Sequence, residues 1–500
     1  MIFKNVLSRS DMISCLLCLD PPCSEACPKG DPAKMLKNVW FDNQDIAAMS
    51  LPCINPCVKC DAPCEKACIS KRNVQIKNII TRLSDEVRPV AEIEIPENES
   101  ALKCDICGVP LENPFLLSSS VVSSTYDMCA RAFDAGWAGA CFKTICSFDI
   151  HEASPRFSAI SGDNGSIIGF KNIEQLSDHS VSENMEIFRK LKKNYPNKVI
   201  LASIMGQNEA EWESLAKLCE ENGADAIELN FSCPNMQEDG LGSDIGQLPE
   251  LVERFTKAAK RSTTIPVFAK LTPNVATMSP AAEAALRGGA DGIAAINTIK
   301  SITGVNPYTY AGDASVRGKS VIGGYSGNAV KPIALRFMAE LGKNEKLKGM
   351  HISGMGGIET WRDALEFMLL GAGSIQITTA VMQYGYGIID QLKAGLNYYL
   401  VQMGIKSVKD IIGAGIDSVS NTTDDLERDT VLLPKFALDK CVHCGRCVVS
   451  CNDGGHQAIS FEDRIPHLDG SKCVGCHLCL LVCPEHAISH SKRRINRGDG

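Results

Sequence analysis

Short apolar runs alternate with amphipathic stretches of helical length between about residue 100 and residue 410. Each apolar run ends in polar residues, and the stretch after it has the spacing of a surface helix. Eight such runs occur: NPFLLSSS (113–120), GACFKTI (139–145), VILASIM (199–205), AIELNFS (226–232), VFAKLT (267–272), GIAAINT (292–298), GMHISGMGG (349–357) and SIQITTAV (374–381). Eight strand–helix units in about 300 residues predict a TIM (β/α)8 barrel. An open doubly wound sheet is the alternative fold.

Clusters of small residues precede several of these runs. They read AGWAGA from position 135, NGADA from 222, GGADG from 288 and GAGS from 371. Glycine often ends a helix because it tolerates the left-handed backbone conformation. We therefore expect each cluster to end a helix and to lead directly into a buried strand.

The two ends of the chain have a different pattern. Residues 1–95 are rich in cysteine and proline and show little alternation, which predicts a small helical cluster-binding region. Residues 435–490 are cysteine-rich again and form a further predicted domain. The basic tail SKRRINRGDG (491–500) is expected to be disordered.

Composition restricts the class of protein. A chain of 500 residues is too long for one core, and a net charge of −8 argues against a nucleic-acid partner. No apolar stretch is long enough to span a membrane, and charges interrupt the first residues before a signal-peptide core forms. We therefore expect a cytoplasmic protein, in which regularly spaced cysteines hold metal or act in catalysis rather than form disulfides.

The C-terminal cysteines form two regular runs. CVHCGRCVVSC and CVGCHLCLLVCP both have the spacing C-x2-C-x2-C-x3-C, which is typical of a ferredoxin with two [4Fe–4S] clusters. In this motif the fourth cysteine of each run binds the other cluster. The predicted ligand sets are Cys441, Cys444, Cys447 and Cys483 for one cluster, and Cys473, Cys476, Cys479 and Cys451 for the other. Zinc or free thiols are the alternatives.

The N-terminal cysteines are less regular. CLLCLDPPCSEAC supplies Cys15, Cys18, Cys23 and Cys27, and CINPCVKCDAPCEKAC supplies Cys53, Cys57, Cys60, Cys64 and Cys68. Nine cysteines suffice for two cubane clusters with one to spare, and the spacing does not identify the spare one. Zinc or a single cluster is the alternative. Four clusters in one chain would make a path for electrons.

The remaining cysteines lie within the barrel segment. Cys104 and Cys107 form a lone C-x2-C, which is more often two ordinary cysteines than a site. Cys129, Cys141 and Cys219 fall within predicted helices and a strand, and we expect them to be small buried residues. Cys146 and Cys233 complete the set.

The strand ends of a TIM barrel carry its active site. Here they carry Ser118 and Ser119, Lys143 and Thr144, Asn230, Ser232 and Cys233, Lys270 and Thr272, Asn297 and Thr298, and Thr378 and Thr379. The seventh strand is followed by Gly354, Gly356 and Gly357. A glycine-rich loop after strand seven and hydroxyls after strand eight predict a site for a phosphate-bearing cofactor.

Polar side chains at the other strand ends suggest what else is bound. Lys143 and Lys270 are suited to stabilise negative charge on a reduced flavin or its phosphate; a rim ion pair is the alternative for each. Asn172, Asn230 and Asn297 both donate and accept hydrogen bonds, as a pyrimidine ring requires. Each asparagine alone would more often be a turn residue.

Cys233 directly follows a buried strand and leads into PNMQEDGLGSDIGQ (234–247), a segment with little periodicity that could close over a ligand. A thiol in that position can exchange a proton with a substrate carbon. No histidine or paired carboxylate occurs at the strand ends to do this, and Ser243 is the weaker competitor.

Taken together, these motifs resemble the pyrimidine-reducing half of dihydropyrimidine dehydrogenases. Residues 100–490 look most similar to the bacterial catalytic subunit, in which an FMN barrel of the dihydroorotate dehydrogenase type precedes a two-cluster ferredoxin. The stretches that carry the resemblance are NPFLLSSS, FKTI, FKNIE, NFSCPN, AKLTPN, INT, GGYSG, SGMGGIET and QITTAV, in this order.

The resemblance implies roles for individual residues. It implies FMN contacts at Ser119, Lys143, Lys270, Gly327, Met355, Gly356, Gly357, Thr378 and Thr379, and substrate contacts at Asn172, Asn230, Phe231, Ser232, Asn297 and Thr298. It implies that Cys233 is the general acid. The expected reaction is reduction of uracil or thymine, with hydride passing from FMN to C6 and a proton from Cys233 to C5, or the reverse. A dihydroorotate dehydrogenase and an electron-transfer subunit with an inactive barrel are the alternatives.

The N-terminal cysteines resemble the Fe–S region of the long, single-chain form of this enzyme. Ligands are implied at Cys15, Cys18, Cys23, Cys27, Cys57, Cys64 and Cys68. The second group departs from the long form in its spacing and in the extra Cys60, and no position matches a glutamine ligand of that form. The long form also carries NAD(P)H and FAD sites, whereas no G-x-G-x-x-G of the Rossmann type occurs here. We therefore expect a partner flavoprotein or a ferredoxin as electron donor. In the long form the C-terminal ferredoxin serves the neighbouring subunit, so the resemblance also implies a dimer or heterotetramer.

Overall fold

The structure is a computed structural model that describes residues 6–88, 99–162, 166–234, 242–420 and 422–496. The chain divides into two compact units, residues 1–416 and residues 417–500. The first contains the N-terminal cysteine-rich region together with the barrel, and the second contains the C-terminal cysteines.

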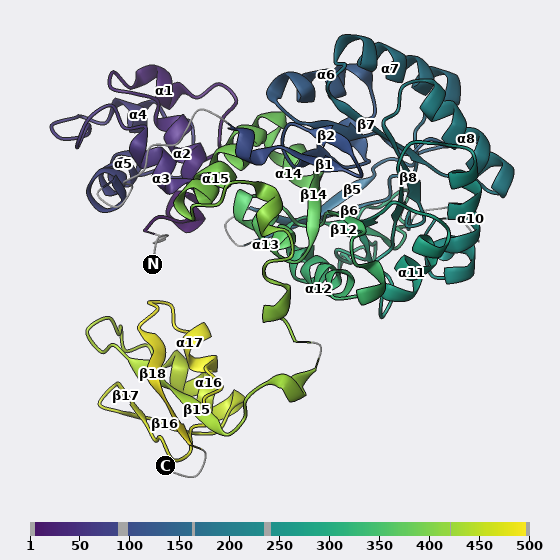
Figure 1. The fold of residues 1–500 in the computed structure, drawn as a ribbon. Coiled ribbons are helices and arrows are strands. Elements are labelled where there is room, and N and C mark those ends of the chain that lie inside the picture. The colour runs from purple at the N-terminus through teal and green to yellow at the C-terminus, as the bar shows by residue number, and fades with distance from the viewer. Residues whose placement is uncertain (1–5, 89–98, 163–165, 235–241, 421, 497–500) are drawn as a thin grey trace. The chain divides into compact units, whose positions relative to one another are not determined.

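Eight parallel strands close into a barrel in the first unit (Figure 1). They are β3 (Phe115–Leu117), β4 (Gly139–Cys141), β7 (Val199–Ile204), β8 (Ala226–Asn230), β9 (Val267–Lys270), β10 (Gly292–Ala295), β13 (His351–Gly354) and β14 (Ala372–Ile377). Their order around the barrel is their order along the chain. Each lies within one of the eight apolar runs, so the predicted TIM barrel is confirmed and the open sheet is excluded.

Helices surround the barrel: α6 (Tyr126–Ala135), α7 (Val181–Asn194), α8 (Glu209–Glu221), α10 (Pro249–Arg261), α11 (Ser279–Arg287), α12 (Lys331–Gly342), α13 (Trp361–Leu369) and α15 (Ile389–Gln402). The predicted glycine signals are confirmed at their ends. Gly136, Gly223, Gly289 and Gly371 follow α6, α8, α11 and α13 and all have positive φ, between 91° and 109°. This conformation favours glycine and lets the chain reverse from the helix into the next strand.

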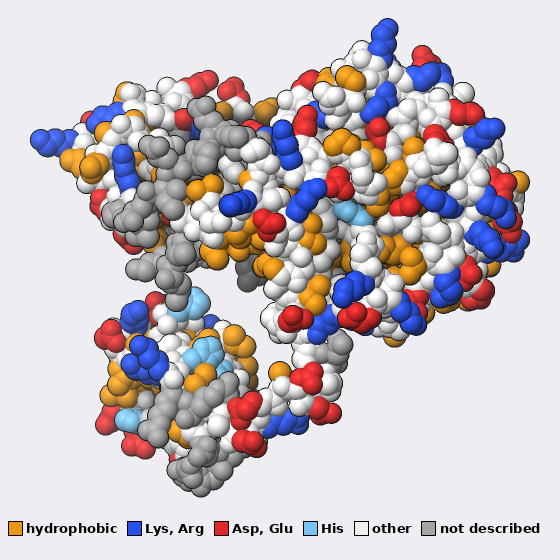
Figure 2. Space-filling view, in the orientation of Figure 1, with side chains coloured by type: hydrophobic (Ala, Val, Ile, Leu, Met, Phe, Trp, Pro, Cys, Tyr) orange, Lys and Arg blue, Asp and Glu red, His pale blue; other side chains and the backbone are white. Residues whose placement is uncertain are grey.

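Charges of both signs lie interspersed over the outer helices on the face shown in Figure 2. Several are paired between neighbouring helices, as in Arg287 of α11 with Glu253 of α10 at 2.8 Å. Among the described residues of this visible face, the two signs of charge are mixed and form no stripe like that of a nucleic-acid site.

A four-stranded antiparallel sheet, which the sequence analysis missed, is formed by two of the strand–helix connections. It consists of β5 (Phe157–Ser161), β6 (Ile167–Asn172), β11 (Ile299–Ser301) and β12 (Gly323–Ser326), in the order β11-β12-β6-β5. The strands are short and half exposed, so they lack the continuous apolar runs by which the barrel strands were found. The sheet carries Asn172 on the strand β6, opposite Gly324 on β12.

A small antiparallel hairpin of β1 (Cys104–Ile106) and β2 (Val109–Leu111) contains the lone C-x2-C pair. Cys104 is buried in β1, and the Cys107 thiol donates a hydrogen bond to the carbonyl of Asp291. Cys129, Cys141 and Cys219 are fully buried, as predicted. The structure therefore supports a packing role for these five cysteines.

The N-terminal region is helical, as predicted. It contains the 3-10 turn η1 (Arg9–Met12), the helices α1 (Pro22–Ala26), α2 (Pro32–Trp40), α3 (Gln44–Met49), α4 (Pro63–Ala67) and α5 (Ile76–Arg82), and the π-turn η2 (Leu83–Val87). The last part of the predicted region, residues 89–95, lies outside the described residues.

This region packs against the barrel beside the loops that follow β13 and β14. The Arg9 guanidinium pairs with the buried carboxylate of Glu359 at 2.6 Å. The Trp361 indole donates to the carbonyl of Asp42, and the Trp40 ring meets Tyr384 edge to face. The cysteine-rich region thus shares a core with the barrel.

The second unit has two two-stranded sheets and two helices: β15 (Thr430–Phe436), α16 (Arg446–Gly454), β16 (Ile459–Glu462), β17 (Ile465–Leu468), α17 (Leu478–Leu481) and β18 (Ile488–Asn496). It has a small core of its own around Val448, Ile459 and Ile488.

The predicted disordered tail is wrong for residues 491–496. These residues belong to β18, which pairs antiparallel with β15 from Phe436↔Ile488 to Thr430↔Asn496. The ladder uses backbone hydrogen bonds, which form regardless of the polar side chains on which the prediction of disorder rested. Residues 497–500 lie outside the described residues.

Within the described part of the chain, no helix combines the length and apolar character that a membrane span requires.

Candidate active site and cluster sites

A cavity of about 1160 Å³, counted with its open mouth, lies at the carboxyl ends of the barrel strands. The predicted site residues that line it are Ser119, Lys143, Asn172, Asn230, Cys233, Lys270, Asn297, Thr298, Gly327, Met355, Gly356, Gly357, Thr378 and Thr379. The register of the barrel brings them together, because pairs such as Asn230↔Lys270 place the strand ends at one level.

Two predicted substrate residues do not line the cavity. The Phe231 side chain is fully buried and packs against Trp212 of α8, with ring centroids 5.2 Å apart. Ser232 is also buried, and its hydroxyl donates to Asn230 Oδ1 at 2.9 Å. The Phe231 side chain therefore has a packing role. Ser232 is connected to the cavity through its hydrogen bond to Asn230, which lines it.

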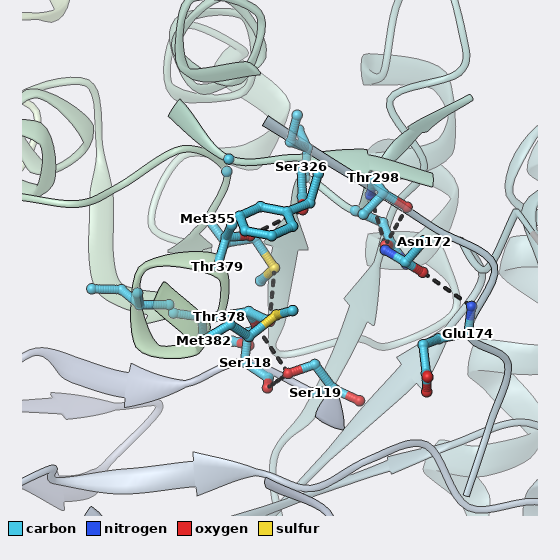
Figure 3. Close-up of a pocket in the computed structure, with 18 of the residues that line it drawn as sticks. Ser118, Ser119, Asn172, Glu174, Thr298, Ser326, Met355, Thr378, Thr379 and Met382 are labelled. Carbon is cyan, nitrogen blue, oxygen red and sulfur yellow. Dashed lines mark hydrogen bonds between the residues drawn. The ribbon is translucent and has the colours of Figure 1, made fainter. Parts of the chain in front are cut away.

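A connected set of amides and hydroxyls forms one wall. Asn297 Nδ2 donates to Ser232 Oγ at 2.7 Å, and Asn230 Nδ2 donates to Thr144 Oγ1 at 2.9 Å. These bonds fix the orientation of the amides. Asn172 and Thr298 lie beside one another in Figure 3, across the cavity from Ser118, Ser119 and Thr378. The three asparagines that the sequence suggested for a pyrimidine ring therefore border one space.

The cavity floor rests on buried polar residues that the sequence analysis missed. Lys270 Nζ lies 3.0 Å from Glu228 Oε1, and both side chains are almost completely buried. Gln376 Nε2 donates to Glu228 Oε2 at 2.9 Å and to Ser353 Oγ at 3.1 Å. Glu228 and Gln376 can be seen in the sequence, because each is a polar residue within an apolar run, AIELNFS and SIQITTAV respectively.

The two predicted lysines differ in their partners. Lys143 Nζ lies 2.9 Å from Glu174 Oε2 and 3.7 Å from Glu152 Oε1. Burial raises the pKa of Glu152. Lys143 thus belongs to a cluster at the cavity edge, whereas Lys270 belongs to the floor, so both lysines are paired and both also face the cavity.

Glycines form the side of the cavity next to β13 and β14. Gly356, Gly357 and Gly327 have φ of 121°, 81° and 98°. A Cβ on Gly357 would stand 2.7 Å from the backbone nitrogen of Lys331 and 2.9 Å from the carbonyl oxygen of Gly327. This backbone therefore requires glycine. Hydroxyls flank it, since Thr378 Oγ1 lies 3.0 Å from Ser120 Oγ and Thr379 Oγ1 donates to Ser326 Oγ at 3.0 Å.

Cys233 is 6% exposed and lines the cavity directly after β8. Its competitor Ser243 begins the short helix α9 (Ser243–Gly246); it is buried but does not line the cavity, and its backbone N–H donates to the Cys233 carbonyl. The two lining carboxylates, Glu174 and Glu359, are both ion-paired, and no histidine is among the described lining residues. Residues 235–241 of the predicted closing segment lie outside the described residues.

Two cavities in the second unit are each lined by four cysteines. One, of about 420 Å³, is lined by Cys441, Cys444, Cys447 and Cys483. The other, of about 320 Å³, is lined by Cys451, Cys473, Cys476 and Cys479. These are the two crossed sets that the spacing predicts.

The arrangement of cysteines differs from that around a single ion. Within the described residues, no three His, Cys, Asp or Glu side chains come close enough together to hold one metal ion. A cubane cluster takes each thiolate on a different iron, so its ligands surround a space. The predicted ligands Cys15, Cys18, Cys23, Cys27, Cys57, Cys64 and Cys68 all lie in the N-terminal region, on and around α1 and α4.

A barrel with a glycine–hydroxyl loop at its strand ends, joined to a domain with two four-cysteine cavities, defines an oxidoreductase of the flavin and iron–sulfur class. The chain belongs to the dihydroorotate dehydrogenase family, whose model matches residues 101–400. Residues 436–490 match the 4Fe-4S dicluster domain.

Three known proteins are similar to this chain over more than half of its length. The NAD-dependent dihydropyrimidine dehydrogenase subunit PreA of Escherichia coli K12 is 50% identical over 400 residues, which are 80% of this chain and 97% of that protein. The chloroplastic dihydropyrimidine dehydrogenase (NADP(+)) of Arabidopsis thaliana is 37% identical over 66% of this chain and 81% of its own length. The catalytic subunit of dihydroorotate dehydrogenase B (NAD(+)) of Pyrococcus furiosus is 38% identical over 63% of this chain and 98% of its own length.

The family implies FMN, and the residues of the cavity fit it. The positive-φ glycines leave no room for a side chain where a phosphate would meet backbone N–H groups. Gln376 lines the cavity, and its buried Oε1 has no hydrogen-bond partner among the described residues, so it is suited to accept from a ligand N–H. Lys143 and Lys270 supply positive charge at two sides of the same space.

Proposed function

We propose that this chain is the catalytic subunit of a dihydropyrimidine dehydrogenase, which reduces uracil or thymine to the 5,6-dihydropyrimidine or catalyses the reverse. The observation that carries the proposal is the position of Cys233 in one cavity with the oriented amides of Asn230 and Asn297. The overall identity with the E. coli PreA subunit, over most of both chains, supports it.

In this proposal the asparagines bind the ring and fix its orientation. A pyrimidine presents alternating N–H and C=O groups, and an amide side chain can serve both kinds. Asn230 and Asn297 are held by Thr144 and Ser232, so little rotational freedom is lost when a ring binds. Asn172 and Thr298 border the same space from the antiparallel sheet and the end of β10 (Figure 3).

Cys233 gives a proton to the substrate carbon C5. The FMN implied by the family would supply the hydride that reaches C6 and would be contacted by Ser119, Lys143, Lys270, Gly327, Met355, Gly356, Gly357, Thr378 and Thr379. Two electrons and two protons thus saturate the 5,6 double bond. In the reverse direction the Cys233 thiolate accepts the proton from C5.

The clusters would deliver the electrons. We assign the two four-cysteine sets of the second unit to two [4Fe–4S] clusters and propose two more in the N-terminal region. The chain would receive its electrons from an NAD(P)H-oxidising flavoprotein subunit or a ferredoxin, and would act in a dimer or heterotetramer. The description of the E. coli relative as a subunit of an NAD-dependent enzyme supports a partner of this kind.

An anaerobic half-reaction tests the function. The reduced protein is mixed with uracil, thymine or orotate, and flavin reoxidation is followed in the wild type, in Cys233→Ala and in Ser243→Ala. We expect fast reoxidation by uracil or thymine, a decrease of about 100- to 10,000-fold in Cys233→Ala, and little change in Ser243→Ala. Cluster absorbance should be the same in all three proteins.

Two other outcomes would each replace the proposal. Reoxidation by orotate alone would assign the chain to dihydroorotate, which the matching family and the P. furiosus relative make the second candidate. Failure of all three pyrimidines to reoxidise the flavin would leave an electron-transfer subunit with an inactive barrel.

A further inference from the structure

The N-terminal region has a cavity like the two in the second unit. Its volume is about 420 Å³, and the cysteines that line it are Cys27, Cys57, Cys60 and Cys64. The second unit provides an internal reference, because each of its two cavities also has four cysteines in its lining. The N-terminal cavity therefore has the composition of a cubane site, and one of its four cysteines is Cys60.

The local sequence explains why these four meet. Cys15 to Cys27 follow C-x2-C-x4-C-x3-C, and Cys57 to Cys68 follow C-x2-C-x3-C-x3-C, so the two runs form an imperfect repeat once Cys53 is set aside. Both runs end in a five-residue helix that begins with proline, α1 in the first and α4 in the second. Each helix carries a cysteine at its second position and ends immediately before another.

The helices α1 and α4 pack against each other (Figure 1). This packing places the last cysteine of each run among the cysteines of the other run. Cys27, from the end of the first run, joins the cysteines of the second run around the cavity. Cys64, on α4, is buried, and its thiol lies near those of Cys27 and Cys57.

The reciprocal set forms around Cys68, the last cysteine of the second run. The Cys23 thiol lies close to those of Cys18 and Cys68. The Cys15 thiol is close to the same three cysteines. The Ser70 hydroxyl donates to the carbonyl of Ser14 at 2.8 Å, which holds the chain after Cys68 against the chain before Cys15. Both groups thus contain three cysteines of one run and the last of the other.

Cys53 and Cys60 differ in their surroundings. Cys53 is exposed and does not line the cavity. Cys60 lines it, and its backbone is fixed by a hydrogen bond from its N–H to the Cys57 carbonyl and by one from Lys77 Nζ to its own carbonyl at 2.7 Å. Lys77 and Lys29 also line the cavity and place positive charge beside a site that would hold an anionic cluster.

We propose that Cys60, and not Cys53, completes an all-cysteine ligand set with Cys27, Cys57 and Cys64. Cys15, Cys18, Cys23 and Cys68 then hold the neighbouring cluster. This assignment rests on the proposal that the N-terminal region carries two clusters, and it is independent of which pyrimidine the barrel reduces.

Metal analysis of the full chain tests the assignment. Wild type, Cys60→Ala and Cys53→Ala are isolated anaerobically, and iron, acid-labile sulfide and flavin are measured per chain. The electron paramagnetic resonance (EPR) spectra of the oxidised and the dithionite-reduced proteins are recorded. Cys60→Ala should lose up to about a quarter of the iron, or convert one cluster to a three-iron form that is paramagnetic when oxidised. Cys53→Ala should match the wild type, and flavin content reports that the barrel is folded.

A conservative variant covers the case in which Cys60→Ala does not fold. Cys60→Ser keeps an oxygen that can bind iron, so it should retain the cluster with an altered EPR spectrum, whereas Cys53→Ser should leave the spectrum unchanged. Unchanged iron and EPR spectra in the Cys60 variants would overturn the assignment, and loss of iron in the Cys53 variants would transfer the role to Cys53.

These readouts also separate the two proposals. A wild type with only about half of the expected iron would contradict the N-terminal clusters and with them the ligand set. Neither iron nor EPR depends on substrate turnover, so the half-reaction with pyrimidines judges the proposed function separately.

Discussion

Polar side chains continue from the cavity floor into the interior of the barrel. Below Lys270, Glu228 and Gln376, the Ser353 hydroxyl accepts a hydrogen bond from Ser374, whose own hydroxyl lies 2.9 Å from His351 Nε2. Buried polar groups are costly unless they are satisfied, and each of these side chains makes at least one hydrogen bond within the network. The network therefore fixes the position of Lys270 beneath the cavity.

His351 makes this network sensitive to pH. Burial lowers the pKa of His351 from 6.5 to about 4. The unfolded chain then binds a proton between pH 6.5 and pH 4 that the folded chain does not, so stability is present above pH 6.5 and is lost as the pH falls. We expect this residue to account for about 2 kcal/mol of stability lost between pH 7 and pH 5.

Urea unfolding at pH 7 and pH 5, followed by tryptophan fluorescence, measures this contribution. His351→Gln should lose less stability than the wild type on acidification, although it is less stable at pH 7. His151→Gln, at an exposed position in the same unit, should behave as the wild type does. Equal pH dependence in His351→Gln and the wild type would contradict the prediction.

At the scale of elements, the eight barrel strands and the glycine endings of four helices could be read from the sequence because both signals are local. The apolar runs mark strands buried on both faces, and glycine marks the change of direction. The antiparallel sheet of β5, β6, β11 and β12 could not be found in this way. Its strands are half exposed, and they are paired by contacts between residues as distant as Asn172 and Gly324.

The glycine loop after β13 can be tested as an element. Gly357→Ala would strain the positive-φ backbone and push Cβ against Lys331 and Gly327. The matched control is Gly349→Ala, because Gly349 also has positive φ but has nothing within 4 Å of its added Cβ. We expect both variants to lose about 1 kcal/mol of stability or slightly more from the backbone conformation.

Only Gly357→Ala should also lose flavin. We expect its dissociation constant for FMN, measured by fluorescence titration of the deflavinated protein, to rise at least tenfold, while that of Gly349→Ala stays within about twofold of the wild type. Equal FMN affinity in the two variants would show that the loop after β13 does not hold the phosphate.

The contact between the N-terminal region and the barrel includes the ion pair of Arg9 with Glu359. Arg9→Ala would leave the Glu359 carboxylate buried without its cation, and burial already raises the pKa of this group. We expect local destabilisation of about 1–3 kcal/mol, seen as faster hydrogen exchange in η1 and α2. Lys217→Ala, which removes an exposed ion pair on α8, should leave exchange in these elements unchanged.

At the scale of the whole molecule, the sequence predicted cysteine-rich regions at both ends of a barrel. In the structure these two regions differ in how they are joined to the barrel. The N-terminal region joins the barrel in one unit, whereas residues 417–500 form a second unit with its own core. This difference arises from contacts such as Trp361 with Asp42, whose partners lie far apart in the sequence and give no local pattern. Cysteine spacing predicted the crossed sets of the second unit for the opposite reason, because that motif is local and regular.

Removal of residues 417–500 tests the independence of the units. Because the first unit keeps its core and the whole cavity, a chain that ends at Ile416 should fold and bind FMN. After chemical reduction, we expect its flavin to be reoxidised by the preferred pyrimidine at a rate within about twofold of the intact chain, with about half of the iron remaining. Loss of flavin, or of reoxidation with flavin still bound, would show that the barrel needs the second unit for more than the delivery of electrons.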